Sequence, residues 1–149
     1  MSKFTSAAPH IACYALLRRD SKVAFVLRAN TSWMDGYYGL PSGKVEWGEP
    51  YTLAMIREAK EEVDVNIKPE HLHHAITIHR HSEDSDWVDI YFEVDEWEGE
   101  VINAEPDVHS EVAWFDLNNL PDNVVPAVSF ALEQIAAGNH FAEDGWENS

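Results

Sequence analysis

The stretch from Gly43 to Val65, GKVEWGEPYTLAMIREAKEEVDV, carries the strongest structural signal in the chain. Its second half has helical periodicity and begins after Pro50, which predicts a helix over Tyr51 to Val63. Because a helix turns by roughly 100° per residue, apolar residues gather on one face and glutamates on another. We therefore expect one face to pack against the protein and the other to present carboxylates. The apolar face holds Leu53, Ile56, Ala59 and Val63, and the acidic face holds Glu58, Glu61 and Glu62.

The glutamates of the acidic face lie so close together that their mutual repulsion has to be offset by a positive charge. Carboxylates at spacing i, i+3 and i+4 repel one another and destabilise an isolated helix. Mg²⁺ is a natural counter-ion, because it takes one or two carboxylates together with water and phosphate oxygens. Arg57 stands four residues before Glu61 and can hold a carboxylate in place. The segment thus predicts a metal site that accepts phosphate, whereas composition alone would favour a solvated acidic surface.

The spacing of the residues in this stretch decides between these alternatives. Gly43, five residues, Glu49, seven residues and then Arg-Glu-Ala-Lys-Glu-Glu from Arg57 resemble the Nudix box of the Nudix hydrolase family. The segments MDGYYGLPSGKVE, NAEPD and EVAWFDLNNLPDN are similar to Nudix sequences as well, so the resemblance covers nearly the whole chain. Asp64 departs from the family pattern, which has glycine there. Since Asp enters left-handed backbone at some cost, we expect a strained but intact turn.

The resemblance implies roles for particular residues. The helix glutamates bind or serve the metal, a main-chain carbonyl before the box glycine adds a contact, and a downstream acid supplies a further ligand or a base. Glu49 and Arg57 brace the loop and the helix. The implied metal ligands are the carbonyl of Ser42 with Glu58, Glu61, Glu62 and Glu105, and the implied catalytic residues are Arg57, Glu58, Glu61, Glu62 and Glu105.

The proton acceptor and the role of Glu105 stay open at this point. Glu58 and Glu105 are both candidates for the base. Glu105 lies in a run that also contains Asp107 and Glu111, so simple solvated charge is the alternative to a role in the site.

Four further residues are candidate substrate contacts. Arg28 and Lys44 are predicted to contact phosphate, with ordinary surface cations as the alternative. Trp33 and Trp87, at loop or strand-edge positions, are predicted to stack on a nucleobase, although aromatic residues more often serve packing.

A histidine-rich segment also suggests metal binding. The histidines at 71, 73, 79 and 81 share parity, which places them on one face of a strand. A strand rises roughly 3.3 Å per residue, so the segment is too long for all four to meet one ion. We therefore do not assign a zinc site to it.

The order of elements and the resemblance together predict one α/β domain over residues 1–149, a Nudix-type α/β/α sandwich with a mixed sheet and a loop-helix-loop catalytic motif. The core is expected over about residues 9–138, and the acidic tail 140–149 is expected to be frayed. Residues 29–48 should form loops around short extended pieces. Predicted strands are His10–Arg18, Lys22–Arg28, Leu72–Arg80, Trp87–Val94 and Glu111–Phe115, with a second helix over Val125–Ala137 before Gly138.

Charge and composition limit the partners. A formal net charge of -17 makes a long nucleic acid a poor partner, so we expect a small nucleotide that arrives with metal. The single cysteine excludes an internal disulfide, and no apolar stretch reaches the length of a membrane span. With no apolar leader at the N-terminus, the expected location is the cytoplasm. Whether the chain forms a homodimer is left open.

The resemblance implies a Mg²⁺-dependent pyrophosphohydrolase, with Mn²⁺ as a substitute, that cleaves a nucleoside diphosphate linked to another group. The expected substrate is a nucleoside triphosphate, including oxidised forms, which would yield a monophosphate and pyrophosphate. A nucleotide sugar or ADP-ribose is the alternative within the same chemistry. A nucleotide-binding module without catalysis is the alternative of another class, and the complete glutamate set argues against it. The low basic content disfavours an RNA 5′-end substrate.

Overall fold

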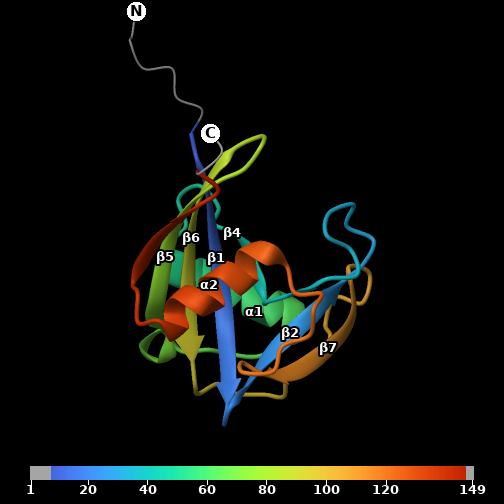
Figure 1. The fold of residues 1–149 in the computed structure, drawn as a ribbon. Coiled ribbons are helices and arrows are strands. Elements are labelled where there is room, and N and C mark those ends of the chain that lie inside the picture. Colours follow the sequence, from blue (N-terminus) through green and yellow to red (C-terminus); the bar gives the residue numbers. More distant parts are fainter. Residues whose placement is uncertain (1–7, 147–149) are drawn as a thin grey trace, which may run out of the picture.

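The computed structural model of the protein describes residues 8–146 and contains a mixed sheet with a helix on each face (Figure 1). The strands are β1 (His10–Arg19), β2 (Lys22–Arg28), β3 (Tyr38–Gly39), β4 (Ser42–Lys44), β5 (His73–His81), β6 (Asp86–Val94), β7 (His109–Asp116) and β8 (Phe141–Asp144). The helices are α1 (Tyr51–Val63), α2 (Pro126–Ala136) and the short 3-10 helix η1 (Pro69–His71). This arrangement confirms the predicted sandwich.

Strand β1 lies at the centre of the sheet and separates two apolar cores. The strand order is β3-β2-β1-β6-β5-β8, with β4 paired to β1 and β7 paired to β2. Side chains alternate along β1, so Ala15 and Leu17 pack in the core under α1, whereas Leu16 packs in the core under α2. Because helices cover both faces, β1 reads as a nearly continuous apolar run.

The sheet opens between β1 and β2. These strands pair only at their hairpin end, at Arg18 with Val23 and at Arg19 with Lys22. Farther along, β3 pairs with β2 and β4 pairs with β1, so the segment 38–44 crosses from one strand to the other. The N–H of Ala15 also donates to the carbonyl of Pro41 at 2.9 Å, which continues the connection to β1. The crossing delivers β4 to the middle of the sheet beneath α1.

Helix α1 has the predicted bounds but packs on a face that is rotated from the predicted one. Ala59 and Val63 are buried as expected, whereas Leu53 is 52% exposed and Glu62 is only 6% exposed. The apolar face was therefore wrong at Leu53, and the expectation that Glu62 belongs to an open acidic face was wrong as well. The cause is the contact with β4, where Glu62 finds a backbone N–H partner.

The end of α1 confirms the expected turn at Asp64. This residue is in the left-handed conformation with φ 59° and ψ 40°, and its N–H donates to the carbonyl of Lys60 at 3.1 Å. The ammonium of Lys60 contacts the Asp64 carboxylate at 2.7 Å, on the exposed side of the helix. An aspartate thus occupies the position that glycine fills most easily.

The other predicted elements are confirmed to within two residues at each end, and β3 and β4 are the short extended pieces expected in the loop region. The tail is different. We expected a frayed segment after residue 140, but Phe141–Asp144 forms β8, which pairs in parallel with β5. Residues 147–149 of that tail lie outside the described part of the chain. In the described part, no helix has the length and apolar character that crossing a bilayer requires.

The histidine-rich segment does not gather into one site. The β5–β6 pairing shifts register between His74 and Ile76, so the regular alternation of the strand is interrupted. His71 lies in η1, and its Nε2 is 3.3 Å from a carboxylate oxygen of Glu96. The ring centres of His79 and His81 each lie 4.7 Å from that of Trp146.

Replacing Asp64 by glycine tests the backbone cost at the end of α1. We expect Asp64→Gly to raise the free energy of unfolding by about 0.5 kcal/mol, because relief of left-handed strain outweighs the exposed ion pair and the added freedom of the unfolded chain. Chemical denaturation of both proteins measures the difference. Lys60→Gln, which removes only the ion pair, is the control, and a destabilised glycine variant would contradict the assignment of strain.

Candidate functional site

The site begins at a close contact between β4 and α1. A Cβ atom added to Gly43 would lie 2.1 Å from the carboxyl carbon of Glu58, well inside any tolerated contact. On the other side, the thiol of Cys13 donates to the Gly43 carbonyl at 3.6 Å. Only glycine therefore lets the Glu58 carboxyl lie directly against the strand.

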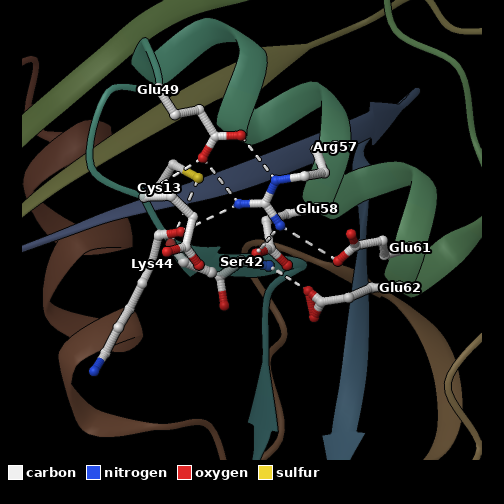
Figure 2. Close-up of polar contacts among 10 residues, drawn as sticks. Cys13, Ser42, Lys44, Glu49, Arg57, Glu58, Glu61 and Glu62 are labelled. Atoms are coloured by element: carbon white, nitrogen blue, oxygen red, sulfur yellow. Dashed lines mark hydrogen bonds and ion pairs between the residues drawn. The ribbon is translucent and has the colours of Figure 1, made fainter.

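Arg57 ties the approach loop to the helix, as Figure 2 shows. Its Nε and Nη2 donate to the two oxygens of Glu49 at 2.8 and 3.0 Å, and its Nη1 donates to Glu58 at 2.9 Å. The contact of Nη1 with Glu61 is longer, at 3.4 Å. The hydrogen bonds from Arg57 lower the pKa of Glu49 to about 2. This fork-shaped pairing fixes the loop that precedes the helix.

Glu62 has a different environment from its neighbours on the helix. Its carboxylate accepts the N–H of Ser42 at 2.9 Å, so the strand residue before Gly43 is bound directly to the helix (Figure 2). Burial raises the pKa of Glu62 well above its usual range. Burial also raises the pKa of Glu58, although Arg57 opposes that effect. Burial therefore makes the ionised form of both carboxyl groups unfavourable, and a nearby cation would offset that cost.

The loop before β7 brings Glu105 to the same place. The carbonyls of Glu62 and Val63 accept the N–H groups of Ala104 and Ile102 at 3.0 and 3.1 Å, so this loop is bound to the end of α1. One ligand atom each from Glu62, Glu105 and His109 lie within 4.8 Å of one another. Burial and the charge of Glu61 raise the pKa of Glu105. Residues more than forty positions apart in sequence thus meet.

His109 was missed by the sequence analysis. It is 4% exposed, and its Nε2 lies 3.7 Å from a Glu62 oxygen. Burial lowers the pKa of His109, with Arg28 adding to the effect. The available signal was its spacing of four residues after Glu105, which one turn can bring together. Indeed, the N–H of His109 donates to the Glu105 carbonyl at 3.0 Å.

All four predicted substrate contacts line one cavity of about 300 Å³, which also reaches Glu62 of α1. Arg28 lies 4.9 Å from the centre of the Trp33 ring, and Lys44 lies 5.4 Å from that of Trp87. The Lys44 ammonium points away from the Arg57 network in Figure 2. Because β6 is an interior strand, the expected strand-edge position of Trp87 was wrong. The cavity lining includes Arg28, Trp33, Ser42, Gly43, Lys44, Glu62 and Trp87.

The donor set fits a divalent cation. Glu62 and Glu105 offer buried or half-buried carboxylate oxygens, and no ammonium or guanidinium is paired with either in residues 8–146. Glu58 and Glu61 adjoin them on α1, but both contact Arg57. Carboxylate oxygens are the ligands that Mg²⁺ and Mn²⁺ prefer. Arg57 thus supplies counter-charge to part of the acidic cluster, and the remaining carboxylates have the chemistry of divalent-cation ligands.

Comparison with known proteins agrees with this geometry. The sequence model described as the NUDIX domain matches residues 8–135, and the chain therefore belongs to the NUDIX domain family. It is 33% identical over 113 residues to an ADP-ribose pyrophosphatase of Methanocaldococcus jannaschii, a match that covers 76% of this chain and 65% of that protein. The chain thus spans less than two thirds of the length of this relative.

Solved structures show the same fold. The crystal structure of a MutT NUDIX hydrolase from Burkholderia pseudomallei is similar with a TM-score of 0.79 and 30% identity, covering 86% of this chain and 98% of that one. A MutT protein from Methanosarcina mazei Go1 has a TM-score of 0.75 and 22% identity, covering 91% of this chain and 99% of that one. The second likeness concerns the fold alone.

A methyl group at Gly43 tests the contact between β4 and α1. We expect Gly43→Ala to lower the free energy of unfolding by about 1–3 kcal/mol, because the new Cβ and the Glu58 carboxyl cannot occupy the same space. Gly39→Ala is the matched control, since a Cβ there meets only ordinary contact with Val125 at 3.8 Å. Equal stability of the two variants in chemical denaturation would show that the contact is unimportant.

Proposed function

We propose that the protein is a divalent-metal-dependent pyrophosphohydrolase that cleaves a nucleoside diphosphate linked to another group. The observation that carries this proposal is the position of the Glu62 carboxylate, buried beside Glu105 at a cavity whose lining includes basic and aromatic side chains. A phosphate chain needs positive charge near the carboxylates, and an aromatic wall suits the nucleobase. The same cavity therefore offers groups that suit the phosphates and groups that suit the nucleobase of a nucleotide.

The residues of the cavity suggest an orientation for the substrate. The phosphates lie towards Glu62 and Ser42, with Arg28 and Lys44 on neighbouring walls, and the base stacks on Trp33 or Trp87. When bound, Mg²⁺ or Mn²⁺ offsets the phosphate charge and lowers the pKa of the attacking water. Arg57 contributes by holding Glu49 and Glu58 in fixed positions rather than by touching the substrate.

We propose a nucleoside triphosphate, including oxidised forms, as the substrate. The cavity volume of about 300 Å³ is at the lower end of the range for small-molecule sites, which suits one nucleoside better than a ligand with a second sugar. ADP-ribose is the second candidate, because the relative from Methanocaldococcus jannaschii carries the name ADP-ribose pyrophosphatase. The single buried thiol of Cys13 supports a cytoplasmic location for either reaction.

A substrate panel tests the reaction and its metal requirement together. Nucleoside triphosphates, 8-oxo-dGTP, nucleotide sugars and ADP-ribose are incubated with Mg²⁺, Mn²⁺ or excess chelator, and the products are separated by chromatography. We expect turnover with either metal and none in chelator. Tight nucleotide binding without any product would instead identify a binding module, and turnover in chelator would refute metal dependence.

Glu62→Gln tests the buried carboxylate. The amide keeps the shape of the side chain but loses the anionic ligand, so we expect kcat to fall by roughly 10² or more while the fold persists. Glu70→Gln, on the exposed surface of η1, is the matched control. A thermal melt of each protein in chelator checks the fold. Near-normal kcat in Glu62→Gln would mean that the Glu62 carboxylate does not serve the reaction.

Glu105→Ala tests the proposed role of the loop before β7. If Glu105 supplies a ligand or the base, kcat should fall by roughly 10² or more and the Mg²⁺ concentration needed for half-maximal rate should rise. Asp107→Ala is the control, because Asp107 is exposed on the same loop. Small and equal effects at both positions would remove Glu105 from the mechanism and leave Glu58 as the candidate base.

A further inference from the structure

His109 is buried beside the helix glutamates with unused hydrogen-bonding capacity. Its side chain is 5% exposed, and in the described part of the chain its Nδ1 is buried without a hydrogen-bond partner. Its Nε2 lies 3.7 Å from Glu62, which is beyond a normal hydrogen bond. Buried polar atoms are nearly always paired, so an imidazole that packs here without partners calls for an explanation.

The neighbours of the ring indicate what is missing. Glu62 and Glu105 each bring a carboxylate oxygen, and the three ligand atoms lie within 4.8 Å of one another. Three ligands spaced evenly around one ion at about 2.1 Å lie about 3.6 Å from one another. The three groups therefore need to draw together by about 1.2 Å at most to share an ion. They also belong to elements that are fixed to one another, because the loop carrying Glu105 is hydrogen-bonded to the end of α1.

We propose that His109 is a nitrogen ligand which, with Glu62 and Glu105, forms a mixed oxygen and nitrogen site for a first-row transition metal such as Mn²⁺. This inference rests on the proposed metal-dependent function, and it adds a residue and a metal preference to it. Imidazole suits first-row transition metals, whereas Mg²⁺ prefers oxygen ligands alone. The position next to His109 should therefore bind Mn²⁺ more tightly than Mg²⁺.

The other reading of His109 is that it only orients Glu62 through a hydrogen bond when the site is loaded. The two readings differ in measurable ways. An orienting residue would support Mg²⁺ and Mn²⁺ to a similar degree, and its nitrogen would not be bonded to the metal. A ligand would favour Mn²⁺ selectively, and the unpaired electrons of Mn²⁺ would couple to the ring nitrogen.

The experiment is pulsed electron paramagnetic resonance on the full chain with Mn²⁺ alone, without nucleotide. We expect nitrogen coupling in the echo modulation of the wild type, and we expect this coupling to change its pattern when histidine is labelled with ¹⁵N. His109→Gln should abolish the coupling. His73→Gln, at an exposed position of β5, is the matched control and should preserve it. If the His109 variant folds poorly, absence of nitrogen coupling in the wild type with bound Mn²⁺ still refutes the proposal.

Calorimetric titration adds the metal preference. We expect His109→Gln to weaken Mn²⁺ binding by tenfold or more and to change Mg²⁺ binding by less than about threefold. Bound Mn²⁺ without nitrogen coupling, or an equal loss for both metals, would overturn the ligand role of His109 and leave the proposed function intact. Failure of Mn²⁺ to bind the nucleotide-free wild type would overturn the His109 site, whereas the proposed function is tested separately by turnover in the substrate panel.

Discussion

The close approach of α1 to β4 at Gly43 is the constraint on which the rest of the site depends. Because Gly43 has no side chain, the Glu58 carboxyl lies against the strand, and one turn later Glu62 reaches the N–H of Ser42. The strand can be there only because β1 and β2 separate and the segment 38–44 crosses the gap. The opening of the sheet, the missing Cβ and the buried carboxylate are thus parts of one arrangement.

Arg57 and burial give neighbouring glutamates different chemical characters. Arg57 binds Glu49 through both oxygens and touches Glu58, so this part of the acidic surface carries its own counter-charge. Glu62 instead has a backbone donor and is buried, and that burial raises the pKa of its carboxyl. A helix with closely spaced acids is tolerated here in part because Arg57 offsets some of the charge and burial raises the pKa of Glu62.

Local patterns predicted much of this structure, and long-range contacts account for what they missed. The bounds of α1 and the turn at Asp64 depend on nearby residues, and both were predicted. Leu53 was assigned to the buried face because periodicity cannot show how a helix is rotated on its sheet. His109 was missed because its partners come from α1, about fifty residues earlier. The family resemblance supplied Glu105, whose approach to the helix no local pattern shows.

Strand β8 forms the edge of the sheet that would otherwise be β5. By pairing with β5 it moves the boundary of the sheet outward, so the N–H and C=O groups on that side of β5 are hydrogen-bonded instead of being open to another strand. The new boundary is only four residues long and includes Glu143 and Asp144. Short, charged edges discourage edge-to-edge association. The tail, which the sequence predicts to be frayed, thus supplies a short, charged edge strand of the kind that limits association between sheets.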